Sequence, residues 1–185
     1  ILQIGFVSFL FLGSSFDDVT LAANQVLLQF LHITAYAMDG FAIAAEALVG
    51  QALGAGAHGT LRRAVVMTSQ WAAGLIVALA VVFAVFGTAM IDVMTTSADV
   101  RLVAVQYLPW MVLAPIMGGA SWMLDGIFIG ATRSRDMRNM MVVSFIIYVI
   151  ALAALMPVFA NHGLWAAMNI FFVARGVTLA IKYPA

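Results

Sequence analysis

The sequence contains no cysteine and few charged residues. The absence of cysteine excludes disulfide bonds, thiolate catalysis and thiolate metal ligands. Only 9% of the residues are charged, and the eight basic and eight acidic side chains leave no net charge. No excess of positive charge therefore indicates a nucleic-acid partner. Water-soluble domains carry about 25% charged residues, so this shortage of charge excludes an ordinary water-soluble domain.

Apolar residues make up 65% of the chain, and the mean hydropathy is +1.09. A segment that spans a bilayer must be a helix or part of a closed barrel, because hydrocarbon offers the backbone no water. The apolar runs are too long and continuous for barrel strands. We therefore expect an all-α integral membrane protein with six transmembrane helices, at residues 1–13, 19–56, 60–91, 98–132, 137–158 and 163–182.

The first of these runs is shorter than the others. A span needs about 20 residues, and the chain begins with Ile1 rather than methionine. We therefore expect the sequence to be a piece of a longer protein that starts inside a helix.

Basic residues alternate between the predicted loops. Seven fall on one predicted side of the membrane: Arg62, Arg63, Arg133, Arg135, Arg138, Arg175 and Lys182. Only Arg101 falls on the opposite side. Cytoplasmic loops are enriched in lysine and arginine. This pattern predicts a multi-pass protein of the cell (inner) membrane with both chain ends in the cytoplasm.

A row of polar residues runs through the second apolar segment. Its members are Gln25, Gln29, His32, Tyr36, Asp39 and Glu46, separated by 4, 3, 4, 3 and 7 residues. At 3.6 residues per turn these positions share one face of a helix. An ionised aspartate at the centre of a spanning helix costs about 2.5–3.5 kcal/mol. We therefore expect the row to line a protein-enclosed or water-filled cavity rather than to face lipid.

Carboxyl groups inside a membrane can gain or lose a proton, which suits them to ion coupling. We predict this role for Asp39 and Glu46, assisted by Asp125 on the fourth segment. Asp125 and Glu46 each lie about eight residues from a predicted break, at Arg133 and Gly54, so we expect them at similar depth. The alternative for all three is a hydrogen-bonded contact between helices without a role in transport.

The fourth segment also contains helix-breaking residues. Pro109, Pro115, Gly118 and Gly119 lie within it. Proline removes a backbone hydrogen bond and kinks a helix. We predict a hinge at these four residues, and the alternative is a static kink that serves packing.

Motifs for metal binding and for hydrolysis are missing. The sequence has no HExxH or CxxC, and its three histidines are scattered, so we expect no metal site. The glycine-rich stretch at residues 50–56 lacks the lysine of a phosphate-binding loop. We expect neither a cofactor nor enzyme activity. A membrane-embedded enzyme that uses Asp39 and Glu46 remains an alternative.

Two stretches resemble the multidrug and toxic compound extrusion (MATE) transporters. LAANQVLLQFLHITAYAMDGFAIAAEALVGQALGAG, residues 21–56, resembles their eighth helix and the following loop, most closely in the DinF branch. MLDGIFIGATRSRDMRN, residues 123–139, resembles the end of their tenth helix. The resemblance implies that residues 1–185 form the C-terminal lobe, helices 7–12 of twelve, and that the N-terminal lobe is absent from this chain.

The resemblance also implies an activity. MATE transporters export cationic or amphipathic compounds in exchange for protons or sodium, by alternating access. In the NorM-type pattern an acidic residue stands where this chain has Trp122, and Asp125 lies about one turn away. That pattern's acidic residue on the seventh helix has no counterpart in residues 1–13. Both departures favour a proton over sodium as the coupling ion.

Partners follow from the same resemblance. They are small amphipathic or cationic substrates, membrane lipid and the N-terminal lobe of the same polypeptide, with no nucleic acid. Two alternatives to drug export remain open. One is a flippase for lipid-linked precursors from the same superfamily, and the other is a structural subunit.

Overall fold

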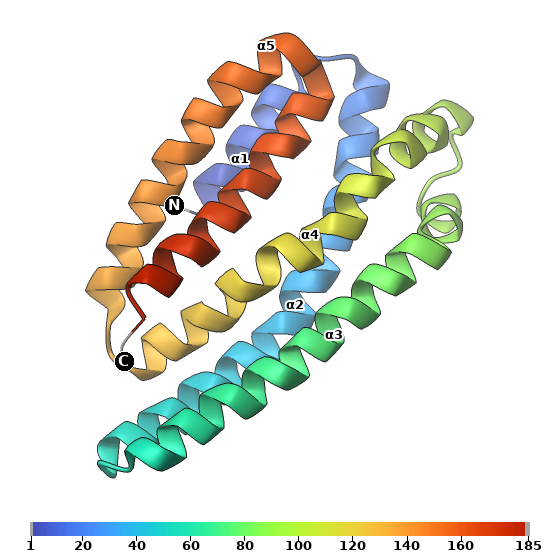
Figure 1. Cartoon of the computed structure of the whole chain (residues 1–185). Helices are drawn as coiled ribbons and strands as arrows, with labels where there is room; N and C mark the ends of the chain where they lie inside the picture. Colours follow the sequence, from blue (N-terminus) through green and yellow to red (C-terminus); the bar gives the residue numbers. More distant parts are fainter. Residues whose placement is uncertain (1, 184–185) are drawn as a thin grey trace.

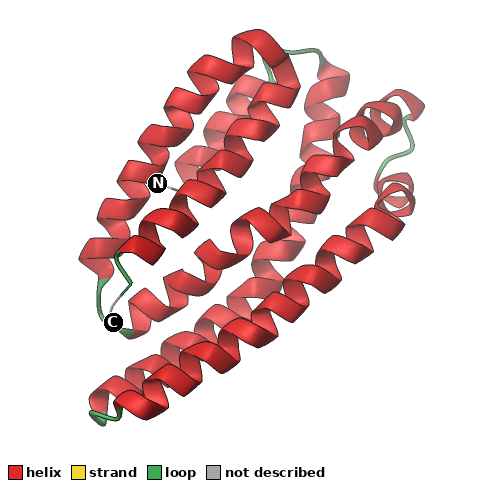
Figure 2. Ribbon diagram, viewed as in Figure 1, coloured by secondary structure: helices red, strands yellow, loops and turns green. Residues whose placement is uncertain are grey.

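The computed structural model describes residues 2–183, so Ile1 of the first predicted segment lies outside the described residues (Figure 1). Within this range the chain forms five helices: α1 (Leu2–Gly13), α2 (Asp18–Gly54), α3 (His58–Met94), α4 (Ala98–Gly130) and α5 (Ser134–Ile181). The described residues contain no β-strand (Figure 2). The all-α class predicted from the sequence is confirmed.

Helix α5 consists of two rods that lie side by side and run in opposite directions (Figure 1). The chain reverses at Ala160, whose φ of 48° and ψ of −125° are not helical. Gly163 allows the two rods to meet closely, because a Cβ atom there would lie 2.3 Å from the carbonyl oxygen of Leu155. The six predicted helices are therefore not matched exactly, because no loop divides the last two, but the reversal falls in the gap predicted between residues 158 and 163.

The connections alternate between two ends of the molecule. The α2–α3 and α4–α5 turns lie at the same end as the C-terminus (Figure 1). The α1–α2 and α3–α4 connections lie at the opposite end, together with the reversal of α5 (Figure 1). Gly56 and Thr132, in the α2–α3 and α4–α5 turns, have positive φ angles. The helices from α2 onward therefore pass five times between the two ends, because α5 makes two passes, and the short α1 covers only part of the distance.

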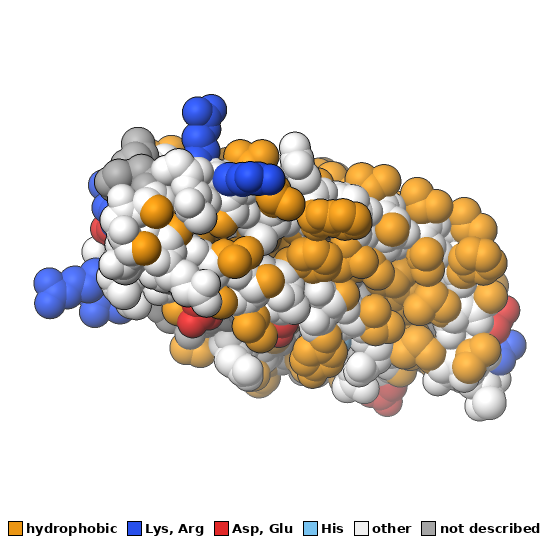
Figure 3. Space-filling view, turned by 90° about the horizontal axis from the view of Figure 1, so that it is seen from below, with side chains coloured by type: hydrophobic (Ala, Val, Ile, Leu, Met, Phe, Trp, Pro, Cys, Tyr) orange, Lys and Arg blue, Asp and Glu red, His pale blue; other side chains and the backbone are white. Residues whose placement is uncertain are grey.

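The surface is that of a protein surrounded by lipid. Helices α2, α3, α4 and α5 are each long and apolar enough to cross a membrane. Apolar side chains cover much of the surface, and basic side chains gather near one end (Figure 3). Phe11, Val93 and Ile181 are between 75% and 89% exposed. Water would not tolerate so much apolar surface on a monomer, so the chain is a multi-pass membrane protein.

Helices α2 and α4 make the most extensive contact between helices in the fold. Two glycines of α4, one turn apart, bring the backbones together. A Cβ atom on Gly126 would lie 2.2 Å from the carbonyl oxygen of Ala42, and one on Gly130 would lie 2.5 Å from that of Glu46. Small residues at this spacing let membrane helices approach closely. This contact places Asp125 beside the middle of α2.

A buried polar cluster joins α2 to the reversal of α5. The side-chain amides of Asn24 and Asn161 exchange hydrogen bonds of 2.8 and 3.0 Å. The indole N–H of Trp165 donates to the Asn24 Oδ1 atom at 2.9 Å. All three side chains are at most 3% exposed. The cluster therefore fixes the position of the second α5 rod against α2.

Replacing Asn24 with leucine is expected to lower the free energy of unfolding by about 3 kcal/mol. The Asn161 amide and the Trp165 N–H would remain buried without their partner, and each such loss costs about 1–3 kcal/mol. Denaturant titration in detergent micelles measures the change. The neighbouring exposed residue gives a matched control, because Gln25→Leu is expected to change stability by no more than about 0.5 kcal/mol. Equal effects of the two substitutions would contradict the role of the cluster.

Candidate functional site

The polar row of α2 lies mostly on the side that this chain does not cover. Gln25, Gln29, Tyr36 and Asp39 are exposed, and Tyr36 is 75% exposed. The opposite side of α2 is buried against the rest of the chain through Leu27, Leu31, Met38 and Ala45. The row is thus available to a cavity, to another part of the protein or to lipid.

His32 and Glu46 lie at the edges of this exposed face, and both are half-buried. The imidazole ring of His32 stacks near Tyr36, with 6.3 Å between ring centroids. It also approaches Phe6 of α1, at 6.0 Å. His32 therefore links the polar row to α1, whereas the backbone of Glu46 lies in the α2–α4 contact at Gly130.

Asp125 forms an ion pair with Arg175. An Nη2 atom of the arginine donates to the Oδ2 atom of the carboxylate. The two side chains are only 4% (Arg175) and 16% (Asp125) exposed. The pair connects α4 to the second rod of α5. Counting Arg175 among the basic residues that mark the cytoplasmic side was therefore wrong, because its charge is held inside the helix packing.

The ion pair has unused hydrogen-bonding capacity. Asp125 Oδ1 and Arg175 Nε and Nη1 are buried and have no hydrogen-bond partner among the described residues. Buried polar atoms are almost always paired with protein or ordered water. Asp125 Oδ1 can therefore bind a proton or accept a hydrogen bond from water or a substrate, and the two arginine nitrogens can donate hydrogen bonds to water or to a substrate.

Asp39 lies near the level of this ion pair. It precedes Ala42 by three residues, and the backbone of Ala42 packs against Gly126, next to Asp125. With both acids ionised and Arg175 protonated, the three side chains carry a net charge of −1. Binding one proton or one monovalent cation makes the group neutral. A neutral group is favoured in a medium that penalises charge, so this group has the right charge for exchange of a proton with a cation.

The structure separates Glu46 from this group of charges. Asp125 precedes Gly126, which lies against Ala42, about one turn from Glu46 toward Asp39. We expected Asp125 and Glu46 at similar depth because each was counted from a helix end. The packing of Gly126 on Ala42 puts them about one turn apart, because α2 continues beyond the level of Gly130, the last residue of α4 (Figure 1).

The predicted hinge residues lie inside a continuous helix. Pro109 and Pro115 both fall within α4, which runs without interruption to Gly130. A Cβ atom on Gly118 would lie 2.7 Å from the Trp122 ring, and one on Gly119 would lie 2.0 Å from Ile76 Cδ1. The two glycines thus accommodate large neighbours. Hinge motion at these positions stays a prediction.

Sequence reasoning missed Arg175 as a site residue. The sequence feature that could have indicated Arg175 is its position inside the apolar run FFVARGVTLAI. A charge at that depth in a membrane needs a partner. Asn161, Trp165 and Asn169 are spaced four residues apart on the same rod, which indicates a buried polar face. Arg175 follows Asn169 by six residues and lies on another side of the helix, so this spacing does not identify it.

Comparisons with known proteins agree with the resemblance seen in the sequence. The sequence model of the MatE family matches residues 2–155 of this chain. The chain is 39% identical over 186 aligned positions to DNA damage-inducible protein F of Escherichia coli (strain K12). The alignment covers 97% of this chain but only 39% of that relative, so the chain spans about two-fifths of its length.

The family match also decides between transport and catalysis. Members of this family are transporters and not enzymes, which sets aside the membrane-embedded enzyme considered for Asp39 and Glu46. The helical fold, the apolar surface and the matched residues agree, and the chain belongs to the MatE family of membrane transporters.

Proposed function

We propose that this chain forms one lobe of a secondary active exporter that exchanges protons for cationic or amphipathic toxic compounds. The observation that carries the proposal is the buried ion pair of Asp125 and Arg175 within the membrane-spanning helices, with Asp39 near its level on α2. The charge of −1 on these three side chains is neutralised equally well by a proton or by a monovalent cationic substrate. Each ligand therefore displaces the other, which is the thermodynamic requirement for exchange.

Each residue has a distinct role in this proposal. Asp39 is the exposed carboxyl that exchanges its proton with the cavity. Asp125 contributes the second negative charge, and Arg175 prevents the site from becoming doubly negative. Glu46 acts one to two turns nearer the end of α2, on the path between the site and the end of the molecule that carries the basic loops.

The remaining polar row provides contacts for the substrate. Gln25, Gln29, His32 and Tyr36 offer amide, imidazole and phenol groups along the exposed face of α2. A mixed aromatic and amide surface suits amphipathic cations, because aromatic faces attract cations. This face would line a cavity shared with a second lobe of the same polypeptide, and hinge motion at Pro109, Pro115, Gly118 and Gly119 would help to open it to alternate sides.

The proposal includes an orientation and a coupling ion. We infer from the basic loops at Arg62, Arg63, Arg133, Arg135 and Arg138 that this end faces the cytoplasm and that the protein lies in the cell (inner) membrane. Two carboxyl groups and an arginine give few oxygen ligands for sodium. A proton needs only one carboxyl oxygen and is therefore the proposed coupling ion, with no further cofactor.

The Asp39→Asn substitution tests this function. It removes one negative charge, so the site becomes neutral without a proton and can no longer exchange protons for substrate. In proteoliposomes that contain the full-length protein, efflux of a fluorescent lipophilic cation driven by an imposed pH gradient is expected to fall to background. Asp99→Asn changes an exposed acid at the start of α4 and is expected to keep full efflux.

Two results would contradict the proposal. The first is full pH-driven efflux by the Asp39→Asn protein. The second is efflux that responds to a sodium gradient and not to a pH gradient, which would replace the proton by sodium. Transport of a lipid-linked precursor in place of the cation would support a flippase of the same superfamily instead.

A further inference from the structure

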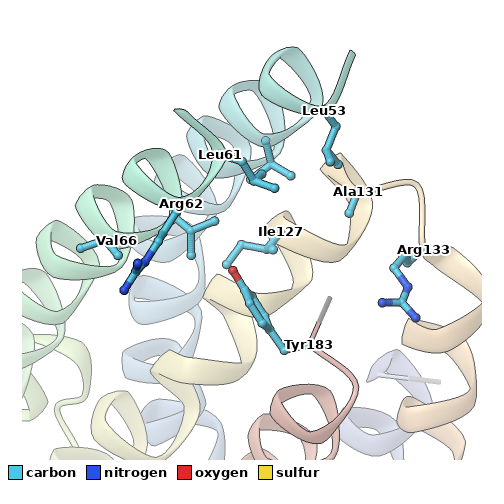
Figure 4. A pocket seen from close by; sticks show the side chains of 10 residues that line it. Leu53, Leu61, Arg62, Val66, Ile127, Ala131, Arg133 and Tyr183 are labelled. Atoms are coloured by element: carbon cyan, nitrogen blue, oxygen red, sulfur yellow. The ribbon is translucent and has the colours of Figure 1, made fainter. Parts of the chain in front are cut away.

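A cavity of about 650 Å³ opens at the end of the molecule that carries the basic loops. It lies between the α2–α3 turn and the end of α4 (Figure 4). Leu53, Leu61, Ile127 and Ala131 supply apolar walls. Two arginines, Arg62 and Arg133, lie on opposite sides of it, with Tyr183 between them (Figure 4). The cavity is therefore apolar inside and positively charged at its mouth.

A second cavity continues from the first along α3 and α4. It measures about 750 Å³, and Val65, Ile127 and Tyr183 line both cavities. Its walls are almost wholly apolar and include Ile76 and Met123. Together the two cavities form a groove with a basic mouth and a long apolar continuation, which we call the α3–α4 groove.

The α3–α4 groove opens on an apolar part of the surface. Val66, Val77 and Ile116 line it and are 45%, 59% and 54% exposed. Apolar side chains exposed at this level of a membrane protein contact acyl chains. An acyl chain can thus enter the groove from the side without crossing a polar barrier.

The two arginines differ in how much charge they offer. Arg133 contacts the carboxylate of Asp136, with its Nε and Nη2 atoms each 2.8 Å from Oδ2. This partner neutralises much of its charge. Arg62 is exposed, and no ion pair involves it among the described residues. Arginine binds phosphate through a planar fork of N–H donors, so Arg62 is the stronger anchor for an anionic headgroup.

We propose that the α3–α4 groove holds an anionic phospholipid, with its phosphate at Arg62 and Arg133 and one acyl chain along α3 and α4. Charge complementarity selects an anionic headgroup over a zwitterionic one. The apolar continuation selects a lipid over a free phosphate. Cationic transport substrates are excluded from the mouth by the same arginines.

The groove is separate from the site proposed for ion coupling. Asp125 lies two residues from both Met123 and Ile127, and two residues correspond to about 200° around a helix. Its side chain therefore leaves α4 on the side opposite the groove. The lipid site does not depend on the proposed transport function, and each can fail without the other.

Native mass spectrometry of the purified full-length protein tests the lipid site. The protein is titrated with phosphatidylglycerol or with phosphatidylcholine of identical acyl chains. We expect tighter retention of phosphatidylglycerol, and about fivefold weaker binding in Arg62→Gln, because one arginine near an anionic lipid surface contributes about 1 kcal/mol. Arg133→Gln is expected to have a smaller effect because Asp136 already neutralises that residue.

Two further variants distinguish lipid binding in the groove from a general attraction of anionic lipid to the basic end of the molecule. Arg63 adjoins Arg62 but lines a different cavity, together with Trp71, so Arg63→Gln is expected to keep the affinity of the unchanged protein. Ala73→Phe places a large ring in the apolar part of the groove and is expected to weaken binding without any change in charge.

The proposal is overturned by any of three results. They are equal retention of the two lipids, equal effects of Arg62→Gln and Arg63→Gln, and unchanged binding in Ala73→Phe. In a final experiment, glycerol phosphate, which has no acyl chains, is tested as a competitor of the intact lipid. If it competes as well as the intact lipid, the arginines form a phosphate site and the groove does not hold a lipid.

Discussion

Replacing Arg175 with methionine is expected to lower the free energy of unfolding by about 3–5 kcal/mol. Removal of one partner of a buried ion pair leaves the other charge without compensation, and this is the usual size of the penalty. The carboxylate of Asp125 would remain 16% exposed between α4 and α5, with no cation beside it. Because native proteins are stable by only about 5–15 kcal/mol, such a loss would endanger folding.

Thermal and denaturant unfolding in detergent micelles measures this change. Arg138→Met provides a matched control, because Arg138 is exposed at the start of α5 and its loss is expected to cost at most about 0.5 kcal/mol. A cost for Arg175→Met no larger than that of the control would show that the ion pair contributes nothing to the folded state.

The double substitution Asp125→Leu with Arg175→Met separates stability from transport. Replacing a whole buried ion pair by apolar side chains is often neutral or stabilising, so the double variant is expected to recover most of the stability lost in Arg175→Met. It is still expected to lose pH-driven efflux, since the proposed coupling site lacks both Asp125 and Arg175. If the double variant recovered both stability and pH-driven efflux, the Asp125–Arg175 pair would have only a structural role.

Substitution of Gly126 by alanine is expected to give the second large loss of stability, about 3 kcal/mol. The added Cβ atom would lie 2.2 Å from the carbonyl oxygen and 2.8 Å from the Cα atom of Ala42. Overpacking usually costs about 1–3 kcal/mol. The upper part of this range applies because the obstacle is backbone, which cannot rotate away as a side chain does.

Gly74 supplies the control for this prediction. It lies within α3, and nothing lies within 4 Å of a Cβ atom placed there. Gly74→Ala is therefore expected to raise stability by about 0.5–1 kcal/mol, because alanine loses less conformational freedom in a helix. Opposite signs for the two substitutions would establish the close contact of α2 and α4, and equal signs would contradict it.

The sequence was most informative about features that depend on periodicity and composition. Helical class and membrane insertion follow from long apolar runs, α2 ends at the predicted break at Gly54, and the α3–α4 link falls in the gap predicted between residues 91 and 98. The polar row of α2 was visible because 3.6-residue spacing is a local property. These features need no knowledge of which helices are neighbours.

Features that depend on packing were harder to predict. Asp125 and Arg175 lie 50 residues apart, so nothing local could pair them. The reversal at Ala160 falls in the gap predicted between residues 158 and 163, but its tightness was not predicted, because it depends on Gly163 letting one rod turn directly onto the other. The relative depth of Asp125 and Glu46 depends on how far α2 extends past α4, which becomes visible only in three dimensions.

The abrupt turn of α5 limits how the topology of this protein can be mapped. Reporter enzymes, epitope tags and protease sites need a few residues of accessible, unstructured backbone. At Ala160 there is no such stretch, and Asn161 immediately beyond it belongs to the buried amide cluster. An insertion there would pull apart the two rods it was meant to locate. The Thr95–Ser97 link, which joins α3 to α4 at the same end, is the better place for a label.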